Sequence, residues 1–443
     1  MSTLLSPLKE LAPFTQQPAS THPPSQAYII GLRGLFVLSS FLYTSLLVLA
    51  PNSVAHSPNA SASSSRPTTL HKALKFISIL FWNSGLIYSA SILLSARTLA
   101  LPFLTTPSSS LKSNIAGCVF RRGIRLWIPV AVGLGISVGI FKAIGYEYID
   151  EFARETGNTS ILVPYKIDSF LVWFNSVFNL FWVTNKFAAQ SASYAFPGQM
   201  LWAVGVVYMQ SFTVYMTMVI IPYTRPSWRI RGAVFFILTA WWVQSWAWYS
   251  ITGLLLADLS VNMSFKTKAQ RGIPIYRSIR LPSYVLYFVL LAAGLVMQYL
   301  WVAWRPSYQD DELRMHGGLY YTGGLNEDFD VRQPQARDDN YLVLLGFMLC
   351  VETSDILQCA LGNSFLVYLG RRSLSWFLVQ CIVVYTLGIK LYQGLHLDNS
   401  VAAVAVCFFS SLATTVVGVE VFYRSIEVPS QVLSHKAFDW IKE

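Results

Sequence analysis

The chain has 443 residues, of which 54% are hydrophobic and only 12% are charged. Soluble domains carry about 25% charged residues, so this composition excludes an ordinary soluble protein. The net charge is +10, but the charges lie between apolar runs, which indicates membrane topology and not nucleic-acid binding. The five scattered cysteines predict neither a disulfide framework nor a metal site.

Apolar runs of about 20 residues recur along the chain, as transmembrane helices require. They predict an all-α fold, a polytopic membrane bundle of about ten transmembrane helices. The expected spans are 28–50, 73–96, 124–144, 169–185, 199–222, 232–257, 282–304, 341–361, 364–390 and 400–423. Residues 1–26 are expected to form a disordered cytosolic tail, residues 27–432 a single transmembrane domain, and residues 433–443 a short cytosolic tail.

Positive charges predict the orientation of these spans, because basic connections stay on the cytosolic side. The basic segments 97–123 and 258–281 place both termini in the cytosol. The acidic segments 145–168 and 305–340 then lie on the outer or lumenal side. Segment 223–231 carries three arginines but falls on the outer or lumenal side, which is an exception to the rule.

The same orientation makes predictions about modification and compartment. Glycosylation sequons at Asn59 and Asn158 fall on the lumenal side, which predicts a glycoprotein, whereas Asn262 falls on the cytosolic side. The expected location is the endoplasmic reticulum or another endomembrane. The expected partners are the lipid bilayer and a lipophilic small-molecule substrate, with no nucleic acid; the oligomeric state stays open.

The first span contains Arg33 between Gly31 and Gly34, small residues that allow another backbone to come close. An arginine in hydrocarbon costs a few kcal/mol, so it either reaches the membrane surface or holds an anion. GLRG at the start of a first hydrophobic helix resembles the acyltransferase-3 family of integral-membrane acyltransferases. The functional interpretation of Arg33 is an anion clamp at the cytosolic mouth of a site. The resemblance implies a catalytic histidine eleven residues after this arginine, where this chain has Thr44.

Four further stretches resemble the same family, namely residues 121–130, 201–212, 368–380 and 422–429. They imply the family's fold but not its acid–base groups. Val207 stands at an acidic position of the family and Gln380 where histidine is common, while Glu427 and Pro429 are in place. The histidines are expected only in loops, in tails or at a helix edge: His22, His56, His71, His316, His396 and His435.

Carboxylates inside the spans are the next candidates for catalysis. Glu352 and Asp355 are three residues apart, which predicts one helical face, and Glu420 lies in the last span. Burial in hydrocarbon favours a protonated carboxyl, which can donate a proton, and Asp355 is the preferred donor. The structural alternative is polar contact between helices, or pairing with a basic residue near the cytosolic face: Arg371, Arg372 or Arg424.

Aromatic residues are concentrated in the span 232–257. Trp242, Trp246 and Tyr249 follow helical spacing there and are predicted to bind substrate. An aromatic face stabilises a cation, so these rings suit a carbocation intermediate. In this respect the chain is similar to the membrane-bound terpene cyclases of fungal meroterpenoid pathways, which have a frame like that of the acyltransferase-3 family.

Three hypotheses for the function remain open. The first is a terpene cyclase of fungal specialised metabolism that cyclises a prenylated substrate after protonating it, with no cofactor and no metal. The second is an acyltransferase that uses acyl-CoA as co-substrate, with His71 or His316 as an unrecognised base. The third is a non-catalytic transporter or scaffold on the same frame. The missing histidine counts against the second, while intramembrane acids are compatible with the first and third.

Overall fold

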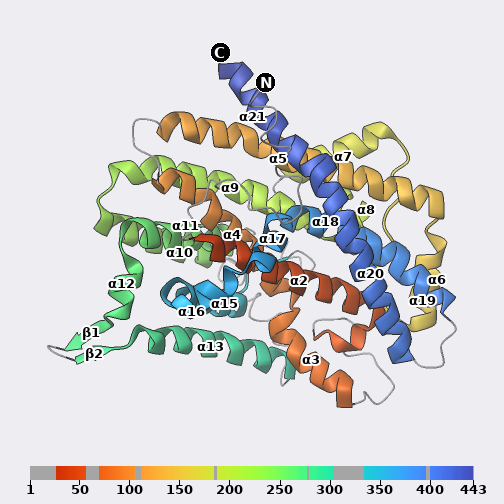
Figure 1. Ribbon diagram of the computed structural model, residues 1–443, viewed down its shortest axis with the longest axis horizontal. Coiled ribbons are helices and arrows are strands. Elements are labelled where there is room, and N and C mark those ends of the chain that lie inside the picture. Colours follow the sequence, from red (N-terminus) through yellow and green to blue (C-terminus); the bar gives the residue numbers. More distant parts are fainter. Residues whose placement is uncertain are drawn as a thin grey trace, which may run out of the picture.

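The computed structural model describes residues 26–55, 69–105, 111–183, 187–276, 279–303, 334–395 and 400–442. This part of the chain is almost entirely helical (Figure 1), which confirms the all-α prediction. Seven helical segments in it are long and apolar enough to cross a membrane, and an eighth is reached if a bent helix pair is counted as one span. The prediction of about ten spans is therefore not confirmed.

The first span is α2 (Ala27–Leu49), which crosses α17 (Ser364–Arg371) at very short distance. A Cβ atom added at Gly31 would lie 1.7 Å from the Leu361 carbonyl oxygen, and one at Gly370 would lie 1.8 Å from the Ile30 carbonyl oxygen. The expectation that the glycines of GLRG admit another backbone is thus confirmed. Only hydrogen fits at these crossing points.

The second span is longer than expected and is broken. After the short η2 (Pro51–Ser53), α3 (Thr69–Phe81) ends just before Asn83, and α4 (Ser84–Thr105) continues beyond the predicted end at residue 96. The following helix α5 (Leu111–Ile144) begins thirteen residues before its predicted start at residue 124. Arg97 is consequently inside a helix and fully buried, and not part of a connecting loop.

The predicted span 169–185 is too short to cross. The amphipathic α6 (Glu147–Thr156) precedes it, and α7 (Phe170–Trp182) has 13 residues, which corresponds to about 20 Å of helix against about 30 Å of hydrocarbon. Next come η4 (Phe187–Ala189), α8 (Ser191–Ala195), η5 (Pro197–Gln199), α9 (Trp202–Ile220) and η6 (Ile221–Tyr223).

The predicted span 232–257 is wrong, because the chain forms two helices there. α10 (Pro226–Trp242) and α11 (Ala247–Asn262) are separated at Gln244, which has a φ of 51°. Arg229 near the start of α10 forms an ion pair of 3.6 Å with Asp258 near the end of α11. The two helices therefore run antiparallel, and residues 223–231 lie beside the end of α11.

The antiparallel pair α10–α11 changes the predicted side of the membrane for the three arginines of segment 223–231. Tyr215, near the end of α9, donates a hydrogen bond of 3.2 Å to the Cys118 carbonyl, so α9 ends beside the start of α5. Ser260 accepts a bond of 2.7 Å from Arg97. The basic segments 97–123, 223–231 and 258–281 thus meet at one end of the bundle, which we call the basic end. The predicted topology placed segment 223–231 on the opposite side from the other two, because it counted α7 as one crossing and α10–α11 as another.

The basic end continues into α12 (Phe265–Gln270) and a small antiparallel hairpin, β1 (Ile273–Tyr276) with β2 (Ile279–Leu281). In Figure 1 these elements lie at the left, and α6 lies at the right, at the other end of α5. The next span, α13 (Ser283–Ala303), packs along α15 (Asp338–Thr353), with Gly294 against Val343 and Gly346 against Leu291.

The C-terminal part is built from broken helices. α16 (Asp355–Leu361) leaves α15 at an angle of 100°, with Ser354 as its N-cap. α18 (Ser373–Val383), the π-helical η7 (Val384–Gly388) and α19 (Ile389–Gly394) form one span. α20 (Ser400–Phe422), the π-helical η8 (Tyr423–Glu427) and α21 (Val428–Lys442) form the last. Residues 433–442, expected as a tail, are thus helical, and α21 packs on α5.

The glycosylation prediction at Asn158 meets a structural obstacle. Its side chain is 1% exposed and donates hydrogen bonds of 3.0 Å to the carbonyls of Leu47 and Val48. A glycan on this nitrogen would require both bonds to break, so we expect Asn158 to stay unmodified in the folded protein. Asn59 lies outside the described residues.

We expect single cysteines at Arg231 and Lys268 to face the same side of the membrane, and one at Arg154 in α6 to face the other. All three side chains are exposed. The measurement is labelling of sealed vesicles with a membrane-impermeant maleimide, in a Cys359→Ser background because Cys359 is itself exposed. Labelling of the cysteines at 231 and 268 from opposite sides would contradict the antiparallel pair α10–α11.

Candidate functional site

Three arginines lie near one another at the basic end: Arg33 of α2 and Arg122 and Arg125 of α5. We call them the arginine cluster. Arg33 donates to the Thr98 hydroxyl at 2.5 Å and to the Leu94 carbonyl at 3.2 Å. Arg122 donates to the hydroxyls of Ser95 and Ser211, both at 2.9 Å. Neutral groups of α4 and α9 therefore orient two of the three guanidinium groups.

No direct ion pair balances the charge of the arginine cluster in the described part of the chain, although Glu427 lies within electrostatic range of Arg125. The positive charges of Arg122 and Arg125 act on Arg33, and none of the three forms an ion pair with a carboxylate in the described part of the chain. Arg33 and Arg122 are half-buried and Arg125 is exposed. Mutual repulsion of partly desolvated cations is unfavourable, so the arrangement favours a bound anion with several oxygen atoms.

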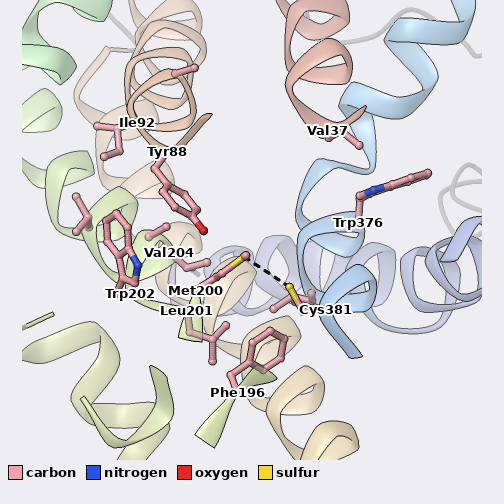
Figure 2. Packing of buried hydrophobic residues seen from close by; sticks show 14 of the residues in the cluster. Val37, Tyr88, Ile92, Phe196, Met200, Leu201, Trp202, Val204, Trp376 and Cys381 are labelled. Atoms are coloured by element: carbon pink, nitrogen blue, oxygen red, sulfur yellow. Dashed lines mark hydrogen bonds between the residues drawn. The ribbon is translucent and has the colours of Figure 1, made fainter. Parts of the chain in front are cut away.

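A second group of polar side chains lies about 16 Å further along α2, eleven residues after Arg33. Thr44 is buried there, with its hydroxyl bonded to the Ser40 carbonyl at 3.0 Å. The Gln380 amide donates to the Ser40 hydroxyl at 2.6 Å. The Cys381 sulfur lies 3.6 Å from the Met200 sulfur (Figure 2). The two positions at which the resemblance implied histidines are thus brought together.

Three tyrosines complete this group, which we call the bundle centre. Tyr43, Tyr88, Tyr385 and Cys381 lie close enough for their ionisable groups to interact. Tyr43 also lies near Ser84. The bundle centre therefore offers hydroxyl, amide and thiol groups. Among its described side chains there is no imidazole and no carboxylate that would act as a base.

Glu352 is fully engaged in a buried ion pair. It is 3% exposed and lies 3.0 Å from the Arg97 guanidinium, and its second oxygen accepts from the Tyr28 hydroxyl at 2.7 Å. Arg97 also donates to Ser260 at 2.7 Å. Both carboxylate oxygens are therefore occupied by donors, so the geometry favours the structural role. Arg97 was not among the predicted partners, because residues 97–123 were expected to form a connection between spans.

Asp355 is separated from Glu352 by the break at Ser354. The expectation that the two acids share one helical face is therefore wrong. The Asp355 side chain is 74% exposed and pairs with Lys266 of α12, which also donates to Gln358 at 3.1 Å. An exposed carboxylate beside a lysine is solvated and charged, so it lacks the apolar surroundings that the proposed donor needs.

Glu420 lies between two arginines. Its oxygens accept from Arg372 at 2.7 Å and from Arg424 at 2.6 Å, and Tyr368 donates to it at 2.7 Å. The structural alternative named Arg372 and Arg424 as possible partners, and the geometry agrees with it. The proton-donor assignments of Glu352, Asp355 and Glu420 remain predictions that this geometry does not favour.

The aromatic residues of segment 232–257 are divided by the break between α10 and α11. Trp242 ends α10 and is 47% exposed, whereas Trp246, directly before α11, and Tyr249, within α11, are buried. A chain of ring contacts, each 4.8–6.2 Å between centroids, connects Trp246 and Tyr249 to Trp202 and to Tyr88 of the bundle centre. The prediction grouped Trp242 with Trp246 and Tyr249 because it assumed one continuous helix. The break between α10 and α11 removes that reason.

Glu427 was not among the predicted catalytic residues, although it occupies a matching position in a stretch that resembles the acyltransferase-3 family. It is 7% exposed and accepts from the Ser375 hydroxyl and, at 3.5 Å, from the Gln431 amide. The positive charges of Arg125 and Arg372 act on it, but neither forms a direct ion pair with it. Of the histidines, only His435 has a described side chain, which contacts Arg121 at 2.6 Å.

No family model, curated protein or solved structure matches this chain.

Proposed function

We propose that the chain is an integral-membrane enzyme that binds a substrate with a phosphate-bearing head and an apolar chain. The observation that carries this proposal is the arginine cluster, in which two of the three cations are oriented by neutral groups and none forms an ion pair with a carboxylate in the described residues. Arginine binds phosphate through two parallel hydrogen bonds, so three of them suit a polyanion.

Acyl-CoA belongs to this class of molecule, because it carries phosphates at one end and an apolar acyl chain at the other. The proposed reaction is transfer of the acyl group to a lipophilic acceptor, as the resemblance to the acyltransferase-3 family suggests. The arginine cluster would hold the phosphates at the basic end. The bundle centre, about 16 Å deeper along α2, would receive the reacting groups.

Replacing Arg125 by alanine should weaken the binding of palmitoyl-CoA by about 10- to 100-fold, because one charge-assisted contact to phosphate is lost. Arg33→Lys should also weaken binding, because lysine lacks the two-pronged geometry of arginine. The measurement is equilibrium binding to the purified protein in detergent.

Arg154→Ala is the matched control, since Arg154 is exposed in α6 and forms only a surface ion pair with Asp150. Equal affinity of the Arg125→Ala and Arg154→Ala variants for palmitoyl-CoA would contradict the proposal. Membranes containing the wild-type protein should also transfer labelled palmitate to a lipophilic alcohol. Binding without any turnover would instead support the non-catalytic scaffold.

The second candidate function is the cyclisation of a prenylated substrate. Two observations favour it: the ring contacts that join Trp246 to Trp202 and Tyr88, and the buried Glu427, whose described partners are a hydroxyl and an amide. Aromatic faces stabilise carbocations and a carboxyl without a cation partner can hold a proton. The same membranes, given a farnesylated phenol, would then form an isomer of unchanged mass.

A further inference from the structure

Two polar atoms in the bundle centre are candidates for binding a ligand, and one of them is buried without a hydrogen-bond partner in the described part of the chain. The first is Oε1 of Gln380, whose side chain is fully buried and whose amide nitrogen is already bonded to Ser40. The second is the hydroxyl of Tyr88, which is 9% exposed. Figure 2 shows the Tyr88 hydroxyl directed toward Met200, whose sulfur contacts Cys381, the residue after Gln380.

Leaving a buried polar group without a partner costs about 1–3 kcal/mol, and most such groups in folded proteins are bonded. The two atoms belong to different helices, α4 and α18, and both side chains lie near Cys381. Their hydrogen-bonding capacities are complementary, because the amide oxygen only accepts whereas the tyrosine hydroxyl also donates.

We infer that the bundle centre binds the hydroxyl group of an apolar alcohol or phenol. The ligand hydroxyl donates to Oε1 of Gln380, and its oxygen accepts from the Tyr88 hydroxyl. Trp202 adds an aromatic surface beside this site, in ring contact with Tyr88 at 4.8 Å. This inference rests on the proposed function, since it names the chemical class of the acceptor that receives the acyl group.

The test compares a farnesylated phenol with its methyl ether, which has the same apolar chain but no hydrogen to donate. The wild-type protein in detergent should bind the phenol about tenfold or more tightly than the ether. Tyr88→Phe and Gln380→Leu should each reduce this preference to about threefold or less. Tyr341→Phe is the matched control, because the Tyr341 hydroxyl already shares a hydrogen bond with Thr252.

A wild-type protein that does not prefer the phenol overturns the inference, as does a Tyr88→Phe variant that keeps the preference. Thermal unfolding of each variant shows whether it is folded, and Tyr88→Phe removes only one oxygen atom. The inference and the proposed function fail separately. Binding of palmitoyl-CoA without phenol preference contradicts the inference alone, and phenol preference without palmitoyl-CoA binding contradicts the proposed function.

Discussion

Replacing Gly370 by alanine should destabilise the protein by about 3 kcal/mol or more. The new Cβ would lie 1.8 Å from the Ile30 carbonyl oxygen, and the Gly34 nitrogen is 3.1 Å from the same point. Both contacts are with backbone of α2, which cannot rotate away as a side chain can. Helices α2 and α17 would have to separate.

Gly139→Ala is the matched control. Gly139 is also inside a helix, α5, but a Cβ at this position would meet no atom within 4 Å. Alanine favours a helix by about 0.5–1 kcal/mol over glycine, so this variant should be as stable as the wild type or slightly more so. Thermal unfolding in detergent measures both. A Gly370→Ala protein as stable as Gly139→Ala would show that α2 and α17 do not cross as described.

The same crossing illustrates what was predictable from the sequence. Gly31 and Gly34 signalled close packing because glycine in a membrane helix commonly marks a helix contact. The partner of this contact, the short α17, was not predictable, because the sequence placed residues 364–390 in one continuous span. The choice of partner depends on a tertiary contact across more than 300 residues.

The helix breaks were only partly predictable. At Ser354 the sequence Ser-Asp is a typical start of a helix, and the Ser354 hydroxyl accepts from the Leu357 amide at 3.4 Å. The break between α10 and α11 contains no proline or glycine. Gln244 adopts a positive φ there, which is uncommon for any residue except glycine. Apolar periodicity alone therefore merged two helices into one and misplaced the three arginines of segment 223–231.

The candidate site was predictable to a similar extent. The chain position of Arg33 and the loss of histidine at Thr44 and Gln380 were readable from the sequence. The ion-pair partners of the acids were not readable from the sequence, because they depend on which basic residue the fold brings close. Arg97 and Glu352 are 255 residues apart in the chain and 3.0 Å apart in the fold.

This pair leads to the second prediction with a large effect. Glu352→Gln should destabilise the protein by about 3–5 kcal/mol, because it leaves the Arg97 charge buried without a counter-charge. Arg97→Met should have a similar effect for the opposite reason. The double variant should be more stable than either single variant, since it removes both charges while the glutamine oxygen can still accept from Tyr28. Unfolding of the three variants in detergent measures this coupling.

The catalytic alternative predicts a different pattern for the same variants. If Glu352 donated a proton, Glu352→Gln would lose turnover by on the order of 100-fold while keeping its stability, and adding Arg97→Met would restore nothing. Asp150→Asn is the control, because Asp150 and Arg154 form an exposed pair that should contribute less than about 1 kcal/mol. A Glu352→Gln protein as stable as Asp150→Asn would refute the structural assignment and return Glu352 to the list of proton donors.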